Sequence, residues 1–130
     1  MLQMACASRK LRDELEAQFS DIGLTANQAM VIHFTASKQG EVYPKNIETH
    51  FQITHPSVSR ILRNMESKGY ISMQPDPEDG RCRRVVLTAL AQEKTEQIDA
   101  RMICIDKLLA HVLTEKEKES LTNILRKLTS

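Results

Sequence analysis

The sequence predicts a mainly α-helical domain that carries one small β-hairpin. Apolar residues recur at helical spacing in the N-terminal and the C-terminal parts of the chain. The only strand-like runs flank a turn-rich segment at residues 75–80. The chain has 130 residues, of which 41% are hydrophobic and 27% charged, so its length and composition predict one soluble globular domain.

Several classes of protein are excluded at this stage. No apolar run is long enough to span a membrane, so we expect no membrane partner. The three cysteines, Cys6, Cys82 and Cys104, are scattered and odd in number, which favours a reducing, cytoplasmic location over a disulfide framework. No metal-ligand spacing, phosphate-binding loop or catalytic set is present, so we expect no metal, no cofactor and no enzyme activity.

The N-terminal part predicts two helices. Leu11, Leu15, Phe19 and Ile22 recur every three or four residues among polar side chains, and Gly23 follows as a stop signal. The run from Thr25 to Gln28 has the form of a capping box and predicts a second helix that continues to about residue 37.

Two short helices follow, separated by a tight connection at residues 52–53. Pro44 can occupy the first turn of one helix. Thr54 is a predicted N-cap for the other, with Pro56 in its first turn and Gly69 at its end. The apolar stripe of this second helix comprises Val58, Ile61, Leu62 and Met65.

The hairpin and two more helices complete the chain. The strands of the hairpin are predicted at residues 70–73 and 83–87. Gly80 is expected to permit a sharp turn at the charged tip of the hairpin. Thr88 is a predicted N-cap for a long helix, and Thr114 and Glu117 form a second capping box. The long helix carries a seam of apolar residues with coiled-coil-like spacing: Ile98, Met102, Ile105, Leu109 and Val112.

Two short helices followed by a hairpin predict a winged helix-turn-helix. In the second helix, Arg60 and Arg63 lie opposite the apolar stripe, flanked by small polar residues, and this arrangement suits a helix that enters the DNA major groove. On the hairpin, Arg81 follows Asp79 and Gly80 and could enter the minor groove. The alternatives are an ordinary solvated helix face and a solvated hairpin whose charges cancel. Net charge is only +1, with a small basic excess in residues 38–84.

The chain resembles the MarR family of bacterial transcription regulators over nearly its whole length. The resemblance rests on Leu24-Thr25-x-x-Gln28, Ile53-Thr54-x-Pro56-Ser57-Val58-Ser59-Arg60, Glu66-x-Lys68-Gly69-Tyr70-Ile71, Asp79-x-Arg81 and Leu87-Thr88. It implies one domain, with a winged helix-turn-helix lobe at residues 24–88 and dimerisation helices at residues 1–23 and 89–130. Met73 departs from the pattern, because family members often carry a basic residue there.

The resemblance implies a homodimer that binds double-stranded DNA at a pseudo-palindromic operator, in the cytoplasm at the nucleoid, as a repressor. Asp79 would brace the wing. The predicted DNA-binding residues are Thr54, His55, Pro56, Ser57, Ser59, Arg60, Arg63, Asn64, Arg81 and Arg83. The predicted dimer-interface residues are Leu11, Leu15, Ile98, Met102, Ile105, Leu109, Val112, Leu121, Ile124 and Leu128.

Regulation is open between several alternatives. Met30, His33 and Phe34 could line a pocket for a small-molecule effector, or could simply be core. Cys6 lies in the region where some branches of the family sense oxidants, although nothing in the sequence marks it as a reactive thiolate. Cys104 is expected to be a packing residue. The main rival to DNA binding is a winged-helix module that contacts only proteins.

Overall fold

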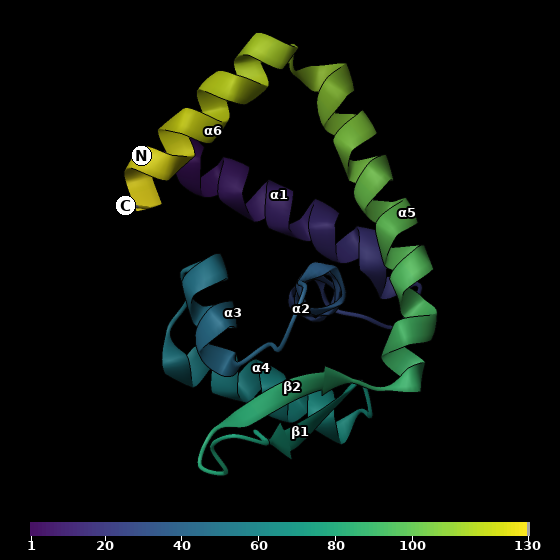
Figure 1. The fold of residues 1–130 in the computed structure, drawn as a ribbon. Helices are drawn as coiled ribbons and strands as arrows, with labels where there is room; N and C mark the ends of the chain where they lie inside the picture. Colours follow the sequence, from purple (N-terminus) through teal and green to yellow (C-terminus); the bar gives the residue numbers. More distant parts are fainter. Residues whose placement is uncertain (130) are drawn as a thin grey trace.

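The structure, a computed structural model, describes residues 1–129 and confirms the predicted order of elements. These residues form six helices and one antiparallel hairpin (Figure 1). The elements are α1 (Leu2–Ser20), α2 (Ala26–Ser37), α3 (Pro44–Phe51), α4 (His55–Ser67), β1 (Ile71–Pro75), β2 (Arg83–Leu87), α5 (Ala89–Val112) and α6 (Glu115–Thr129).

The predicted capping residues begin their helices as expected. Thr25 Oγ1 accepts a hydrogen bond from Gln28 N at 3.2 Å, and Gln28 Oε1 accepts one from Thr25 N at 3.1 Å. The same reciprocal pair joins Thr114 and Glu117 before α6, and the backbone hydrogen bond from Thr114 lowers the pKa of the Glu117 carboxyl. Each pair satisfies amide groups that the first turn of a helix leaves without an intrahelical partner.

The hairpin pairs Ile71 with Leu87 at one end and Pro75 with Arg83 at the other. The outer edge of β2 is also covered, because Val85 N donates to Val42 O at 2.7 Å. The segment between α2 and α3 therefore lies along β2, and it attaches the hairpin to the helical part of the lobe.

A single core joins five of the helices to the hairpin. Phe19, Ile32, Ile47, Met65 and Ile98 are fully buried, and they come from α1, α2, α3, α4 and α5. Burying one such side chain contributes about 1.5–3 kcal/mol relative to leaving it in water. The relative positions of the helices and the hairpin thus depend on the packing of this shared core.

The C-terminal end of α1 is fastened to α5 by two cationic side chains. Lys94 Nζ donates to Ile22 O at 2.6 Å. Arg101 donates to Gln18 O at 3.3 Å and pairs with Asp21 at 2.6 Å. Carbonyl groups at the end of a helix lack intrahelical donors, and cations are favourable there. These bonds fix the crossing of α1 and α5.

The predicted dimer seam on α5 is wrong in part, because its first residue belongs to the subunit's own core. Ile98 has no exposed surface, and Met102, Ile105 and Leu15 pack against the same core. Ile98 therefore offers nothing to a partner subunit. Coiled-coil-like spacing marks an apolar stripe, and the stripe covers α1 and α2 as its nearest neighbours.

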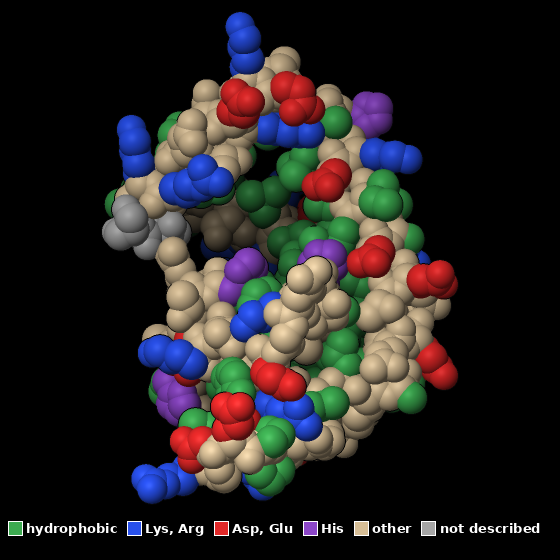
Figure 2. Space-filling model, in the orientation of Figure 1, with side chains coloured by type: hydrophobic (Ala, Val, Ile, Leu, Met, Phe, Trp, Pro, Cys, Tyr) green, Lys and Arg blue, Asp and Glu red, His purple; other side chains and the backbone are tan. Residues whose placement is uncertain are grey.

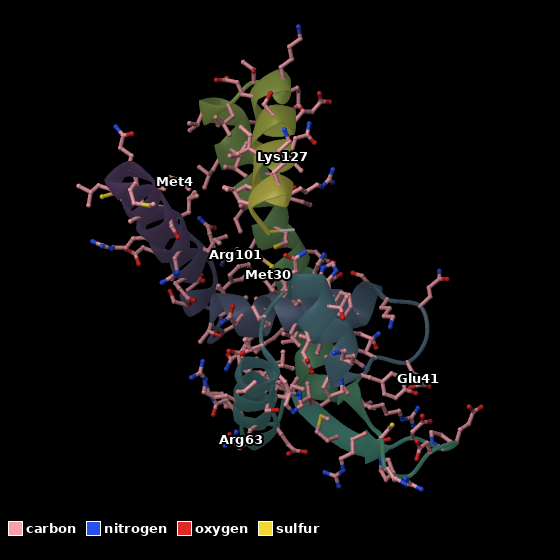
Figure 3. All side chains as sticks on the ribbon, turned by 90° about the vertical axis from the view of Figure 1, so that its left-hand side faces the viewer. Met4, Met30, Glu41, Arg63, Arg101 and Lys127 are labelled. Carbon is pink, nitrogen blue, oxygen red and sulfur yellow. The ribbon has the colours of Figure 1, made fainter. Side chains whose placement is uncertain are left out.

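Helix α6 extends away from the lobe, and none of its described side chains is buried. It turns back sharply from the end of α5 (Figure 1), and Figure 3 shows Lys127 of α6 apart from Met4 of α1. Its apolar face is solvent-exposed in the single chain and comprises Leu121, Ile124, Leu125 and Leu128. No helix within residues 1–129 combines the length and the apolarity that crossing a bilayer requires.

Candidate nucleic-acid interface

Helix α4 has one buried face and one free face, as the sequence predicted. Val58, Leu62 and Met65 are buried in the core. Arg60, Arg63 and Asn64 are exposed, and Figure 3 shows Arg63 on the outer side of this helix. Because residues three or four apart share a helix face, the core contacts hold the arginines towards solvent. The helix can therefore present them to an external ligand without losing its packing.

The start of α4 is held by its N-cap and by α3. Thr54 Oγ1 accepts from Ser57 N at 3.3 Å and donates to Ser57 Oγ at 2.9 Å. Pro56 lies in the first turn, where its missing amide hydrogen removes no intrahelical bond. His55 Nδ1 lies 2.9 Å from Glu48 Oε2 of α3. The first turn is thus positioned by its neighbours as well as by its own backbone.

The tip of the wing is organised by Asp79. Its Oδ1 accepts from Arg81 N at 3.1 Å, and its backbone oxygen accepts from Cys82 N at 3.0 Å. Asp79 therefore holds the backbone around Arg81, and it does not hold the guanidinium of an arginine. The expectation for Gly80 is wrong, since its φ is not positive and the turn does not need the left-handed conformation. The negative charge of Asp79 raises the pKa of the Cys82 thiol.

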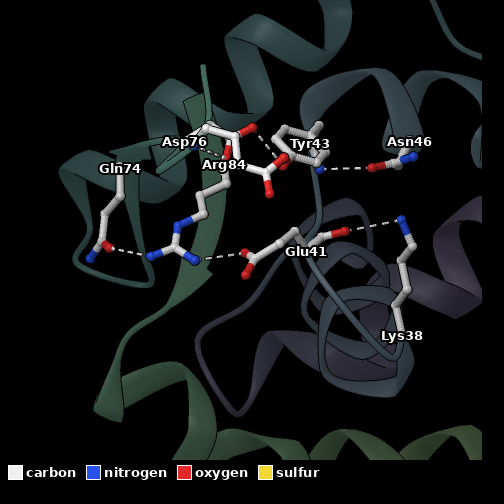
Figure 4. A network of polar contacts seen from close by, with 8 residues as sticks. Lys38, Glu41, Tyr43, Asn46, Gln74, Asp76 and Arg84 are labelled. Atoms are coloured by element: carbon white, nitrogen blue, oxygen red, sulfur yellow. Dashed lines mark hydrogen bonds and ion pairs between the residues drawn. The ribbon is translucent and has the colours of Figure 1, made fainter. Parts of the chain in front are cut away.

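A polar network fixes the wing to the α2–α3 connection (Figure 4). Arg84 forms an ion pair with Glu41 at 2.8 Å and donates to Gln74 Oε1 at 3.4 Å. Tyr43 Oη donates to Asp76 Oδ2 at 2.9 Å, and this hydrogen bond raises the pKa of the Tyr43 hydroxyl. The base of the wing is therefore held from two sides.

Four arginines on α4 and the wing have no acidic partner among the described residues: Arg60, Arg63, Arg81 and Arg83. On the wing, Asp76 is engaged by Tyr43 and by the amide of Glu78, and Asp79 by the amide of Arg81. The wing carboxylates thus bond to other groups. Their charges do not pair with the wing arginines, as they would in a merely solvated hairpin, and the basic groups remain available to an anion.

An open cleft of about 530 Å³ separates the wing from the start of α3. Its lining includes Tyr43, Asp76 and three basic residues, Lys45, Arg81 and Arg83. Lys45 also contacts Glu48, with Nζ 3.9 Å from Oε1. Lys45 and Glu48 were not predicted as site residues. No local pattern in the sequence reveals them, because their position depends on how α3 packs beside the wing.

Residues 22–81, which span the helix-turn-helix, the first strand of the hairpin and most of its tip, match the sequence model of the MarR family. Over this segment the chain is similar to the MarR family. This similarity groups the chain with transcription regulators and not with enzymes.

Similar proteins extend this resemblance over a larger part of the chain. An HTH-type transcriptional regulator of Bacillus subtilis strain 168, YwoH, is 25% identical, and the match covers 95% of this chain and 89% of that protein. The fold is shared with the transcription regulator MarR of Oenococcus oeni PSU-1 (TM-score 0.83, 22% identity, 97% and 95% of the two chains). It is also shared with S. aureus MepR in a complex with DNA (TM-score 0.84, 23% identity, 98% and 93%).

The residues suggested for an effector pocket are half-buried, and two of them face different elements. His33 Nδ1 lies 3.1 Å from Asp99 Oδ1 of α5. Phe34 stacks on His50, with ring centroids 4.4 Å apart, and meets Phe51 edge-on. Met30 is also half-buried. The structure thus does not bring the three side chains together around one enclosed space.

The three cysteines are all free and exposed. Cys6 lies on the exposed N-terminal part of α1, and Cys82 lies on the wing. The expectation that Cys104 is a packing residue is wrong within the single chain, because its position on α5 faces away from the core. Among residues 1–129, no group of three potential ligands is arranged to hold a metal ion.

Proposed function

We propose that this chain is a homodimeric repressor that binds a pseudo-palindromic DNA operator, in the cytoplasm at the nucleoid. The observation that carries the proposal is the set of four unpaired arginines on α4 and the wing, on a surface that the core and the wing network hold in place. The MepR–DNA complex, which has the same fold, supports DNA as the partner. Unpaired arginines suit phosphate and guanine groups in particular.

In this proposal, α4 enters the major groove. Ser57, Ser59 and Arg60 lie nearest the base edges, whereas Arg63 and Asn64 reach base edges or phosphates. The start of the helix is formed by Thr54, His55 and Pro56. The backbone N–H groups of this first turn and the imidazole of His55 suit contacts with phosphate. On the wing, Arg81 enters the minor groove and Arg83 contacts the backbone. Lys45, beside the same cleft, adds a further cation.

The proposed dimer uses α1, α5 and α6. Their exposed apolar residues include Leu11, Leu108, Val112, Ile124 and Leu128. A single chain in water would leave this large apolar surface uncovered, and such surfaces mark interaction sites. A two-fold dimer would place its two recognition helices about one DNA turn apart, near 34 Å.

Release by a signal completes the proposal. A space-filling view shows a hollow between the α5–α6 arm and the DNA-binding lobe, with apolar side chains along it (Figure 2). A small-molecule effector held in this hollow, or oxidation of Cys6, would act between the dimer region and α4. The test is release of bound DNA by added aromatic acids or by peroxide, with Cys6→Ser separating the oxidant route from the ligand route.

The test of DNA binding is selection from a random duplex library, followed by affinity measurements by fluorescence anisotropy at two salt concentrations. We expect an enriched inverted repeat whose affinity falls steeply with salt, because phosphate contacts release counterions. Arg60→Ala should weaken binding to that site. A folded protein that enriches no duplex, with and without reducing agent, would contradict the proposal and favour a protein partner.

A further inference from the structure

A three-residue hydrogen-bond chain leads from α3 to the proposed DNA-reading side of α4. Glu48 Oε2 lies 2.9 Å from His55 Nδ1, and His55 Nε2 lies 3.5 Å from Ser59 Oγ. Glu48 is largely buried, with 14% of its side chain exposed, whereas 71% of the His55 side chain is exposed. The carboxylate is thus the fixed end of the chain, and the serine hydroxyl is its outer end.

The direction of these hydrogen bonds follows from their chemistry. An ionised carboxylate only accepts hydrogen bonds, so the nitrogen of His55 that faces it must carry the proton. In the neutral imidazole the other nitrogen is then an acceptor. With this neutral tautomer, Ser59 donates its hydroxyl hydrogen to His55 Nε2. Lys45 Nζ lies 3.9 Å from the other oxygen of the same carboxylate.

Ser59 differs in this respect from another serine of the same helix. Ser67 Oγ donates to Asn64 O, a carbonyl of α4 itself, at 2.9 Å. Among the described residues, the only hydrogen-bond partner of the Ser59 hydroxyl is His55. The orientation of the Ser59 hydroxyl is therefore coupled to the imidazole and not to the helix backbone.

We propose that Glu48 is a positioning residue that sets the base preference of α4 through His55 and Ser59. With its hydrogen directed at His55, the Ser59 hydroxyl offers only lone pairs to the groove. In the major groove the hydrogen-bond donors are the amino groups of adenine and cytosine. Ser59 thus selects adenine or cytosine over guanine or thymine. The inference rests on the proposed DNA-binding function and adds which base groups are read.

The first test needs no DNA. Long-range proton–nitrogen NMR correlations report which imidazole nitrogen carries hydrogen, and the His55 signals can be assigned by comparison with His55→Gln. We expect the Nδ1–H tautomer in the native protein and an increase of the Nε2–H tautomer in Glu48→Gln. A native protein with His55 in the Nε2–H tautomer would overturn the proposal.

The second test measures affinity for the selected operator and for variants with each base pair of one half-site changed. Ser59→Ala should reduce discrimination at one position, by roughly two- to tenfold, the range of one net hydrogen bond. Glu48→Gln should reduce discrimination at that same position, and the double variant should do no more than Ser59→Ala alone. Lys45→Ala is the matched control, and it should lower affinity equally on every duplex.

The possible outcomes distinguish a failure of the positioning role of Glu48 from a failure of the proposed DNA-binding function. If Glu48→Gln changes affinity by the same factor on all duplexes, the carboxylate acts only through its charge, and the positioning role is wrong while DNA binding stands. If no duplex is enriched, the proposed function fails and the base-reading role fails with it.

Discussion

The arginines of the wing divide into two kinds according to their partners. Arg84 is held by Glu41 and Gln74 and ties the hairpin to the body of the lobe. Arg81 and Arg83, nearer the tip, have no acidic partner in residues 1–129. Arginine thus stabilises the attachment of the hairpin at one position and is a cation without an acidic partner at two others.

We expect Arg81→Ala to weaken operator binding by roughly 1–3 kcal/mol, because it removes a guanidinium proposed to enter the minor groove. Fluorescence anisotropy at fixed salt measures the effect. Arg9→Ala, which removes an exposed arginine on α1, is the control and should leave affinity unchanged. Equal affinities for the Arg81→Ala variant and the native protein would show that Arg81 does not enter the minor groove.

Cys82 offers a second prediction at the level of single residues. The pKa of its thiol is raised, chiefly by the charge of Asp79, so little of it is thiolate near neutral pH. Asp79→Asn should lower this pKa and speed alkylation of Cys82 by iodoacetamide, as followed by peptide-resolved mass spectrometry. Cys6 and Cys104 are internal controls, and their rates should stay the same. A slower reaction of Cys82 in the variant would contradict the electrostatic explanation.

For single residues, the sequence predicts which side chains have a structural role better than it predicts which groups they contact. Asp79 was expected to brace the wing, and it does so through backbone amides and not through an arginine side chain. Glu48 was not expected at all. Its contact with His55 depends on how α3 and α4 cross, and side-chain spacing along one helix carries no information about that angle.

Among the elements, the helix starts were the most predictable features. Capping residues act within one turn, so Thr25, Thr54, Thr88 and Thr114 could be identified from neighbours three residues away. The hairpin was predictable because turn residues separate two short runs with strand propensity. The attachment of Val42 to β2 was not, since it joins segments that are distant in sequence.

Thr88 links two elements, and we expect Thr88→Ala to lower the free energy of unfolding by about 1 kcal/mol. Its Oγ1 accepts from Ala91 N at 3.4 Å and donates to Gly69 O at 2.5 Å. Urea unfolding measures the change. Thr95→Ala is the control, because among the described residues the Thr95 hydroxyl bonds only to Gln92 O of its own helix. A loss no larger than that of the control would mean that Thr88 does not act as a cap.

For the whole molecule, periodicity identified an apolar stripe but not what covers it. Ile98 and Val112 lie on the same predicted seam, yet Ile98 has no exposed surface while 78% of Val112 is exposed. Burial against the chain's own core and burial against a second copy need the same residue types at the same spacing. Only the three-dimensional arrangement separates the two ends of the stripe.

We expect Ile124→Glu to dissociate the proposed dimer, because it places a charge on the exposed apolar face of α6. Sedimentation velocity measures the change in mass. Asn123→Glu adds the same charge on the opposite face of the helix and should leave the dimer intact. Since no described side chain of α6 is buried in the single chain, the subunit should still fold. An Ile124→Glu variant that sediments as a dimer would contradict the α6 interface.

The junction of the wing with α5 makes these two elements move together as one rigid unit. One residue, Thr88, separates β2 from α5, and it is hydrogen-bonded to Gly69 and Tyr70. The 24 residues of α5 form a rod about 36 Å long. If one end pivots by about 10°, the other swings by roughly 6 Å, nearly two base-pair steps along a DNA strand. A small change in the angle between the α5 helices of the two subunits would thus shift the wings and recognition helices by several ångströms. Their separation would then no longer match the spacing of the DNA half-sites.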